Sequence, residues 1–149
     1  MRILIQRVRR ASVSIGGTLK SAIGPGLLVF VGIEAEDGEE DIEWLAGKLT
    51  RLRIFDDENG VMNLDVRQVG GEILVVSQFT LHASTRKQPP VLYQGGPRSD
   101  FPTFVRAVRR RCRPCARARS RHRGVRSDMQ VELVNDGPVT IWIDSRQRE

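Results

Sequence analysis

The sequence predicts one domain of the α/β or α+β class, built around a mixed β-sheet. Three observations lead to this fold class. Most of the chain divides into alternating or unbroken apolar segments that are typical of strands. At least one amphipathic helix interrupts them, and 40% of the 149 residues are hydrophobic, which is enough for a core without a disulfide or a metal. We therefore expect residues 1–149 to form a single domain.

The first third of the chain predicts strands, a turn and a helix. Residues 2–15 alternate in two stretches, ILIQRV and ASVSI, and a Gly-Gly pair leads into a short return over residues 18–23. Residues 27–33, LLVFVGI, are apolar throughout, as in a strand buried on both faces. Residues 39–52 fit a helix, because acids stand in the first turn and bases near the end. Its inward stripe consists of Ile42, Leu45, Leu49 and Leu52.

The second half contains further strands and one segment without a period. Residues 72–81, EILVVSQFTL, read as another buried strand. Residues 129–136 alternate, GPV breaks the pattern, and residues 140–144 resume it. The apolar positions of residues 101–108 suit a short helix, whereas residues 109–126 follow neither the strand nor the helix period and predict loop or disorder.

The net charge of +6 and the pI near 10.3 invite a nucleic-acid interpretation, but the charge is unevenly distributed. Residues 86–126 hold 13 Lys and Arg and one acid, a net charge of +12. The rest of the chain holds 11 bases and 17 acids, a net charge of −6. No apolar run approaches the ~18 residues of a membrane span, and the N-terminus lacks a signal-peptide core. We therefore expect no membrane partner and a cytoplasmic location.

Cys112 and Cys115 form a CxxC pair inside the basic block. A zinc site needs four organised ligands, and this pair has no second half beyond two scattered histidines, His82 and His122. A thioredoxin-like redox site requires a strand-to-helix context that is missing here. We expect neither a metal nor a cofactor.

SQFTL (residues 77–81) ends a buried strand with polar side chains. Strand ends are where sheet proteins place reactive groups and free backbone N–H donors, but the same residues also suit an ordinary turn. His82 lies two residues after Thr80 and would share its face on a continuing strand, so it is a possible general base. A surface histidine is the plainer interpretation, because no carboxylate in this stretch could orient it.

NDGPVT (residues 135–140) lies between two strand segments. Proline cannot donate to a ladder, so a Gly-Pro pair here belongs at a sheet edge or a break. A trans turn is the default expectation, because only about 5–6% of X–Pro bonds are cis.

Taken together, these stretches resemble the D-aminoacyl-tRNA deacylase family. MRILIQRVRRASVSI, GPGLLVFVGI, LRIFDDENGVMN, GGEILVVSQFTL and MQVELVNDGPVTIWIDS stand in family order and at family spacing. The resemblance covers residues 1–87 and 127–145, and SQFTL and NDGPVT are the two signature motifs. It implies a mixed, largely antiparallel and barrel-like sheet with flanking helices.

The resemblance also implies an activity. These homodimeric enzymes, without metal or cofactor, hydrolyse the ester that joins a D-amino acid, or glycine mischarged on tRNA-Ala, to the 3′-terminal adenosine of tRNA. The Gly137-Pro138 bond would be cis and would reach into the partner subunit's site, where its carbonyls fill the space that an L side chain needs. Arg7 would hold that loop, and Met129 is a second supporting residue.

For SQFTL, the resemblance implies that Ser77, Gln78, Phe79 and Thr80 bind the adenosine and the aminoacyl ester. Backbone N–H groups near Phe79 and Thr80 are candidates for polarising the ester carbonyl. The 2′-hydroxyl of the substrate ribose would assist hydrolysis, since a prepositioned group can reach an effective molarity of about 10⁵ M.

The family pattern is missing from residues 88–127. QPPVLYQGGP (88–97) can be encoded so that the same bases, read one position on, give NRPSYIKAA, which is the family stretch expected there. The same shift converts FVRAV (104–108) into LYEQF and HRGVRS (122–127) into TGVFGA. We therefore hypothesise that residues 88–127 are an aberrant, frame-shifted reading within the domain.

Two further functions remain open at this point. A non-catalytic RNA-binding module would use residues 86–126 as an arm and would bind with a steep salt dependence. An acyl hydrolase with Thr80 as nucleophile would form an acyl-enzyme, although no base accompanies the hydroxyl.

Overall fold

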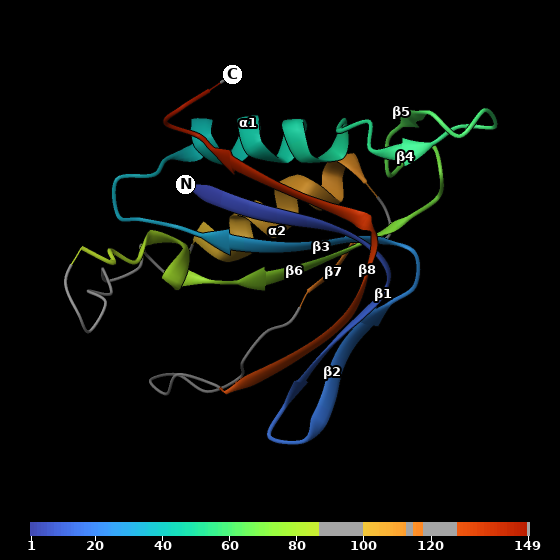
Figure 1. Cartoon of the computed structure of the whole chain (residues 1–149). Helices are drawn as coiled ribbons and strands as arrows, with labels where there is room; N and C mark the ends of the chain where they lie inside the picture. The colour runs from blue at the N-terminus through green and yellow to red at the C-terminus, as the bar shows by residue number, and fades with distance from the viewer. Residues whose placement is uncertain (87–99, 113–114, 118–127, 149) are drawn as a thin grey trace.

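A curled sheet, two helices and a small hairpin make up the fold in this computed structural model, which describes residues 1–86, 100–112, 115–117 and 128–148 (Figure 1). The elements are β1 (Arg2–Ile15), β2 (Thr18–Ile23), β3 (Gly26–Gly32), α1 (Glu39–Thr50), β4 (Phe55–Asp56), β5 (Met62–Leu64), β6 (Glu72–Ser77), the 3-10 turn η1 (Phe79–His82), α2 (Asp100–Arg111), β7 (Cys115–Arg117) and β8 (Met129–Asp144). The sheet order is β2-β1-β3-β6-β7, and β8 pairs with β1. The predicted α+β class with a mixed, largely antiparallel and curled sheet is confirmed.

The two longest strands, β1 and β8, run antiparallel along the sheet from the Arg2–Asp144 pair to the Ile15–Met129 pair. The sequence suggested that GPV ends a strand, but β8 continues through it and the β1–β8 register shifts there instead. Within the described chain β8 pairs only with β1, so the proline costs no ladder hydrogen bond on its other edge.

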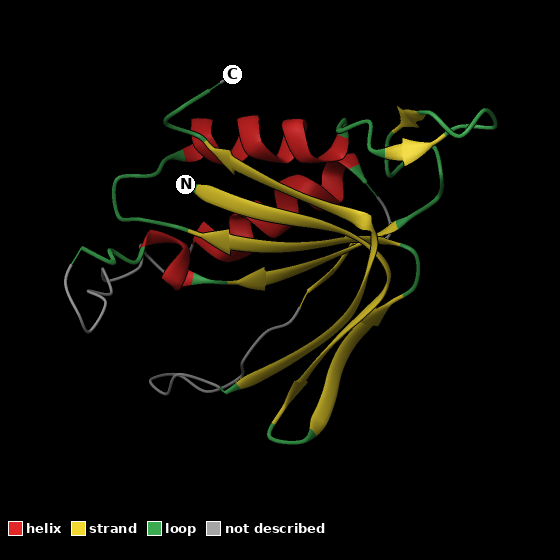
Figure 2. Ribbon diagram, viewed as in Figure 1, coloured by secondary structure: helices red, strands yellow, loops and turns green. Residues whose placement is uncertain are grey.

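β3 and β6 form a parallel pair and therefore need a crossover connection, which α1 and the β4–β5 hairpin supply. β3 is buried on both faces, as its unbroken apolar sequence predicts. Figure 2 shows α1 and α2 lying together against one face of the sheet. The main core forms between them and that face, and a second, smaller core fills the curl of the sheet.

Helix α1 matches its prediction closely. It begins after Gly38, whose N–H donates to the Asp41 carboxylate at 3.0 Å, and it ends at Thr50, two residues earlier than predicted. Three of the four predicted inward residues are buried and the fourth is half-buried, namely Ile42, Leu45, Leu49 and Leu52.

Helix α2 is longer than the short helix that was predicted. Phe104 and Val108 are completely buried in the main core. The helix extends to Arg111, and its last two residues, Arg110 and Arg111, form ion pairs with Glu43 of α1; cations suit the last turn of a helix. The expectation of irregular structure over residues 109–126 is thus wrong for the end of α2 and for β7, while residues 113–114 and 118–126 lie outside the described part.

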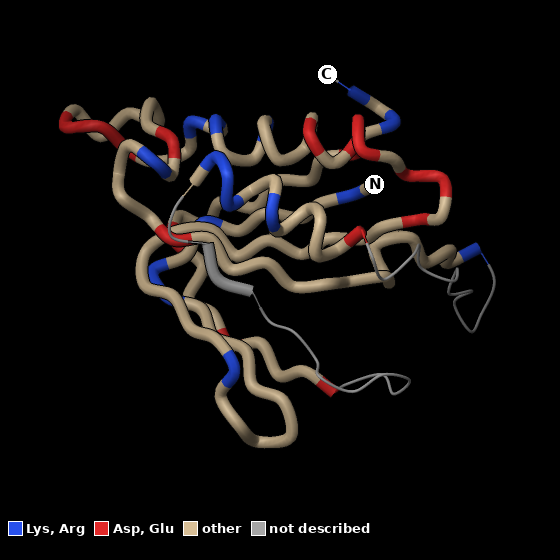
Figure 3. Tube along the Cα trace, turned by 180° about the vertical axis from the view of Figure 1, so that it is seen from behind, with Lys and Arg blue, Asp and Glu red and all other residues tan. Residues whose placement is uncertain are grey.

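Several charges on the described surface form ion pairs between different elements. Figure 3 shows acids clustered at the start of α1 and in the loop before it. Arg146 lies 3.2–3.4 Å from Glu34, Glu36 and Asp37, and Arg148 pairs with Glu40. Most of the basic block, namely residues 87–99, 113–114 and 118–126, is not among the described residues. No described helix is long and apolar enough to cross a membrane.

Candidate active site

The polar end of β6 turns at once into the single 3-10 turn η1. Ser77 and Thr80 are exposed, while Gln78 and Phe79 are half-buried. SQFTL therefore presents polar groups at the surface, at the end of a strand that is itself buried.

Backbone hydrogen bonds tie η1 to the sheet. The Gln78 N–H donates to the Val31 carbonyl at 2.7 Å, which carries the β3–β6 pairing one residue past the strand. Inside the turn, the Leu81 N–H donates to the Gln78 carbonyl at 3.2 Å and the Ala83 N–H to the Thr80 carbonyl at 3.0 Å. The Thr80 N–H donates to no described residue, so it is available to an oxygen atom of a ligand.

The Thr80 hydroxyl has no base beside it within the described chain. It accepts a hydrogen bond from the side-chain amide of Gln78. His82 is not a surface residue as expected, because its side chain is only 4% exposed. A 3-10 turn has three residues per turn, so residues two apart point in different directions and His82 does not face Thr80.

His82 instead lies beside a carboxylate that the local sequence does not contain. Its Nδ1 is 3.3 Å from Oε2 of Glu34, in the loop after β3. The sequence does not reveal this contact between His82 and Glu34, because the two residues are 48 positions apart. The parallel β3–β6 pairing, which sequence alone did not specify, brings these two strand ends together.

NDGPVT forms a small loop within β8. The Gly137-Pro138 peptide is cis, and Gly137 has a φ of +122°. Asn135 closes the loop, because its Oδ1 accepts the Val139 N–H at 3.3 Å and its Nδ2 donates to the Thr140 hydroxyl at 3.1 Å. Gly137 and Pro138 are both exposed. The loop therefore presents its backbone outward, away from its own chain.

Arg7 braces this loop from inside. It is buried, donates from Nη1 to the Ile54 carbonyl at 2.6 Å and donates from Nε to the Asp136 carbonyl at 3.2 Å. The carboxylates of Asp56 and Asp136 each lie 3.5 Å from its guanidinium. A Cβ on Gly137 would stand 3.2 Å from Nη2 of Arg7, so the guanidinium fits closely under the loop.

The two motifs are far apart within one chain. Ser77 pairs with Val31, which pairs with Ile3, whereas the loop crosses β1 near Arg7. At about 4.8 Å per strand and 3.3 Å per residue, the separation is on the order of 20 Å. The chain does not bring its own SQFTL and NDGPVT together.

Met129 lies with neither motif. It pairs with Ile15 at the opposite end of β8 from Asp144 and packs against the second core inside the curl of the sheet. In the described chain, no direct contact between Met129 and either motif supports its predicted role.

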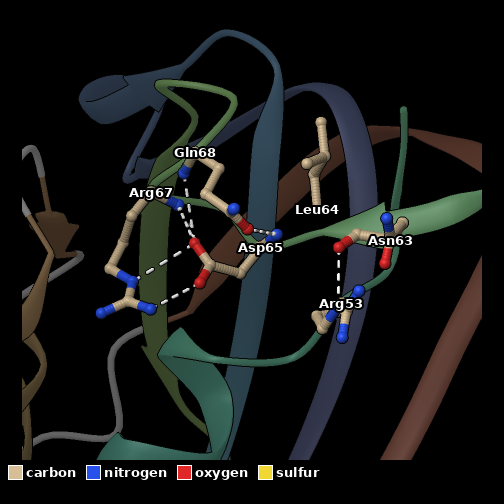
Figure 4. A pocket seen from close by; sticks show the side chains of 6 residues that line it. All are labelled: Arg53, Asn63, Leu64, Asp65, Arg67 and Gln68. Atoms are coloured by element: carbon tan, nitrogen blue, oxygen red, sulfur yellow. Dashed lines mark hydrogen bonds and ion pairs between the residues drawn. The ribbon is translucent and has the colours of Figure 1, made fainter. Parts of the chain in front are cut away.

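A shallow cavity of about 540 Å³ lies beside the β4–β5 hairpin and contains none of the predicted site residues (Figure 4). The Asp65 carboxylate in its wall accepts two hydrogen bonds from the Arg67 side chain and others from the Arg67 and Gln68 N–H groups. The Arg67 guanidinium, together with those N–H groups, holds the pKa of Asp65 below its usual value. These hydrogen bonds stabilise the ionised carboxylate, which makes Asp65 a poor candidate for acid–base chemistry. The lining residues are Arg53, Asn63, Leu64, Asp65, Arg67 and Gln68.

Cys112, the first half of the CxxC pair, is a buried free thiol at the end of α2. Burial raises the pKa of this thiol, which disfavours the reactive thiolate. The side chain of Cys115 lies outside the described part. Among the described residues, no three potential ligands gather in a way that could hold a metal ion.

Comparison with known proteins gives consistent matches. A family model described as "D-Tyr-tRNA(Tyr) deacylase" matches residues 4–144. The chain is 51% identical to a D-aminoacyl-tRNA deacylase of Bacteroides thetaiotaomicron and 54% identical to one of Parabacteroides distasonis, each over 154 aligned positions that cover all of both chains.

Two solved structures share the fold. A structure described as "c-Myc DNA Unwinding Element Binding Protein" is 36% identical with a TM-score of 0.86, covering 97% of this chain and 98% of the other. A probable eukaryotic D-amino acid tRNA deacylase superposes with a TM-score of 0.71 at 15% identity, covering 95% and 97%, which supports the fold alone. About half of all positions are identical over full length, and the family model matches residues 4–144, so the chain belongs to the D-aminoacyl-tRNA deacylase family.

Proposed function

We propose that the protein hydrolyses the ester bond of D-aminoacyl-tRNA in the cytoplasm, releasing the free D-amino acid and the tRNA. The observation that carries this proposal is the pair of signature motifs in a chain of this family: a strand-end turn that offers the Thr80 N–H, and a backbone loop braced from below by Arg7. The substrate would enter by its 3′ acceptor end. Glycine mischarged on tRNA-Ala would also be accepted, because glycine has no side chain to exclude.

The active site would form between two copies of the chain. The motifs of one chain lie on the order of 20 Å apart, so a loop that screens the aminoacyl group must come from a partner. The sheet face away from the helices carries an apolar row between the motifs, in which Leu4 pairs with both Phe30 and Trp142. Trp142 is 47% exposed, an unusual exposure for so large an apolar side chain. A homodimer packed on this row would cover it.

Chiral selection would come from exclusion. The exposed loop presents backbone carbonyls, and a loop held by Arg7 and Asn135 cannot move aside cheaply for a larger group. We propose that the Gly137-Pro138 carbonyls occupy the space on the side of the α-carbon where an L side chain projects. Rejection by a clash with backbone needs no recognition of individual D side chains.

Hydrolysis would use the substrate's own hydroxyl. The Thr80 N–H, with donors near Phe79, would polarise the ester carbonyl and stabilise the tetrahedral oxyanion. The ribose 2′-OH would assist attack by water, after which the 3′-oxygen leaves with a proton. The Thr80 hydroxyl is engaged by Gln78 and lacks a base in the described chain, which favours this route over a threonine nucleophile.

The direct test is hydrolysis of D-Tyr-tRNA and L-Tyr-tRNA by the purified full chain. We expect release of D-tyrosine and at least about 100-fold slower release of L-tyrosine, because a backbone clash on the order of 3 kcal/mol corresponds to that ratio. A substrate ending in 2′-deoxyadenosine should be hydrolysed slowly even at saturation. Equal rates on the D and L substrates, or no hydrolysis of either, would refute the proposal.

We also propose that the coding DNA carries a frame shift over residues 88–127, within a single domain that spans residues 1–149. Phe104 and Val108 are buried, and both FVRAV and the alternative LYEQF place apolar residues at these two points. The burial of Val105 and Ala107 weighs against the shifted frame, which would put larger polar groups there. The codons for residues 88–97 decide the matter, because the hypothesis fails if they cannot be read one base on as NRPSYIKAA.

A further inference from the structure

His82 carries two buried polar atoms that the proposed chemistry does not use. Neither ring nitrogen has a hydrogen-bond partner in the described chain, although the side chain is only 4% exposed. Buried unpaired polar groups are rare in folded proteins, and each has a cost that calls for a physical reason. The location of the ring, directly behind the SQFTL turn, indicates that reason.

The His82 imidazole packs directly on Gly32 of β3 and so holds η1 against the sheet. We call this contact between His82 and Gly32 the seat of η1. A Cβ at position 32 would lie 2.8 Å from Cδ2 of His82, 2.9 Å from its Nε2 and 3.1 Å from the Gln78 carbonyl oxygen. The ring and the first carbonyl of the turn therefore occupy the space that any side chain at Gly32 would take. This close approach fixes how far η1 stands from the sheet, and with it the position of the Thr80 N–H.

The other side of the ring faces a carboxylate that is held in place. Oε2 of Glu34 lies 3.3 Å from Nδ1 of His82 and 3.4 Å from Nη2 of Arg146. The Nδ1 contact is short enough for attraction but is not a hydrogen bond in this conformation. A small rotation of the ring would complete it, and catalytic contacts often tighten only when substrate is bound.

We propose that His82 is a positioning residue for ester hydrolysis: it seats the SQFTL turn on Gly32 and, through Glu34, fixes the direction of the Thr80 N–H. The inference rests on the proposed function for its kinetic consequence, but the seat itself is a property of the free protein. Arg2 supports the same turn from the β1 side, since its Nη1 donates to the Leu81 carbonyl at 3.2 Å.

The kinetic test compares Glu34→Gln and His82→Phe with Glu36→Gln as the matched control. Glu36 is 82% exposed and also contacts Arg146, so its substitution removes the same charge from the same loop without touching His82. We expect Glu34→Gln and His82→Phe to lower kcat for D-Tyr-tRNA about 10- to 100-fold, because small misplacements of a donor are costly, while KM changes less than about threefold. Glu36→Gln should match the wild type.

A double-variant cycle adds a readout that a purely structural role would not give. If His82 acts through Glu34, kcat of the double variant should fall no further than kcat of the worse single variant, because both changes remove the same interaction. Additive losses, or unchanged kcat in both single variants that retain the wild-type unfolding midpoint, would overturn the proposal.

Two NMR measurements on the free protein, without any substrate, test whether His82 holds η1 on Gly32. Glu34→Gln should change the ¹⁵N chemical shifts of the His82 ring, and His82→Phe should accelerate hydrogen exchange of the Gln78 and Ala83 N–H groups, which are hydrogen-bonded at the turn. Glu36→Gln should change neither. If wild-type protein fails to hydrolyse D-aminoacyl-tRNA while these shifts appear, the proposed function fails and the seat stands. If the shifts are absent in an active enzyme, the positioning role fails and the function stands.

Discussion

The SQFTL turn and the NDGPVT loop are built in opposite ways. The turn is joined to its own sheet by the Gln78–Val31 hydrogen bond, by Arg2 and by the His82 ring packed on Gly32. Among the described residues, the loop is held by Arg7, Arg9 and Asn135, and it leaves Gly137 and Pro138 exposed. On the proposed function, the turn would form the wall of a site, and the loop would enter the site of a partner chain.

The largest effect is expected at Gly137. A Cβ there would lie 2.8 Å from Cγ2 of Val139 and 3.0 Å from its N, at a φ of +122° that L residues rarely adopt. We expect Gly137→Ala to lower kcat/KM for D-Tyr-tRNA at least about 100-fold, because the loop must shift. The control is Gly60→Ala, which has a φ of +73° but no neighbour within 4 Å. It should lose stability, about 1–3 kcal/mol, and keep its activity. Wild-type hydrolysis of D-Tyr-tRNA together with unchanged rejection of L-Tyr-tRNA in Gly137→Ala would contradict a role of the loop in the site.

Mixing two inactive variants tests whether the motifs meet across subunits. Gly137→Ala spoils the loop, and Thr80→Pro removes the candidate N–H donor from the turn. In a mixed dimer one of the two sites combines an intact turn with an intact loop. Random mixing in equal amounts makes half of the dimers mixed, so about a quarter of wild-type activity should return. No recovery, in a preparation shown by mass spectrometry to contain mixed dimers, would place both motifs of a site in one chain.

Arg7→Lys tests the brace beneath the loop. Lysine keeps the charge but cannot donate to both the Ile54 and Asp136 carbonyls as the planar guanidinium does. We expect the free energy of unfolding to fall by about 1–3 kcal/mol, since one buried carbonyl loses its charged partner. Hydrolysis of D-Tyr-tRNA should fall about tenfold and rejection of L-Tyr-tRNA should weaken. Urea unfolding followed by circular dichroism checks the expected stability loss, and hydrolysis of D-Tyr-tRNA and L-Tyr-tRNA checks the expected change in activity and selectivity. A stability loss with unchanged selectivity would mean that Arg7 serves the fold alone.

Thr80→Val separates the two candidate mechanisms. The substitution removes the hydroxyl that Gln78 engages but keeps the backbone N–H. If the Thr80 N–H and the substrate 2′-OH promote hydrolysis, we expect kcat to fall less than about tenfold. If the Thr80 hydroxyl is the nucleophile, we expect kcat to fall at least about 1,000-fold. Single-turnover hydrolysis measures the difference. Trapping an acyl-enzyme of the wild type by acid quench, detected by mass spectrometry, would show that Thr80 is the nucleophile.

The sequence predicted this contrast only in part. Periodicity located the strands, α1 and the polar end of β6, because burial on one or both faces imprints a pattern within each segment. It missed the His82–Glu34 pair, since that contact depends on the parallel β3–β6 pairing. It also placed His82 at the surface, because it assumed a strand where the chain makes a 3-10 turn.

The extent of α2 and the strand β7 escaped prediction for a different reason. The last turn of α2 has no apolar period, and its Arg110 and Arg111 form ion pairs with Glu43, 67 and 68 residues away. A run of arginines looks like a solvated arm when its acidic partner is not yet placed. The motifs themselves were recognisable only as a family resemblance, because spacing alone fits ordinary turns equally well.

The smallest effect concerns the support of the turn at low pH. Burial alone would raise the pKa of Asp144, but hydrogen bonds from the Arg146 N–H at 3.0 Å and from Nε of Arg2 at 2.8 Å hold this pKa below its usual value. A carboxylate with a lowered pKa contributes stability above about pH 4, its unfolded value, and loses that contribution as the pH falls through the folded pKa.

Arg2 is 36% exposed, so water screens the pair, and the difference in unfolding free energy between wild type and Asp144→Asn should be at most about 1 kcal/mol at pH 7. It should shrink as the pH falls through the folded pKa of Asp144, because the protonated aspartate is then as neutral as asparagine. Urea unfolding of both proteins from pH 2 to 7 measures the difference, in which the other carboxylates cancel. A difference that stays constant over this range would show that Asp144 supports the turn through packing rather than charge. Retained hydrolysis of D-Tyr-tRNA in Asp144→Asn would then mean that Val31 and His82 hold the turn without the help of Arg2.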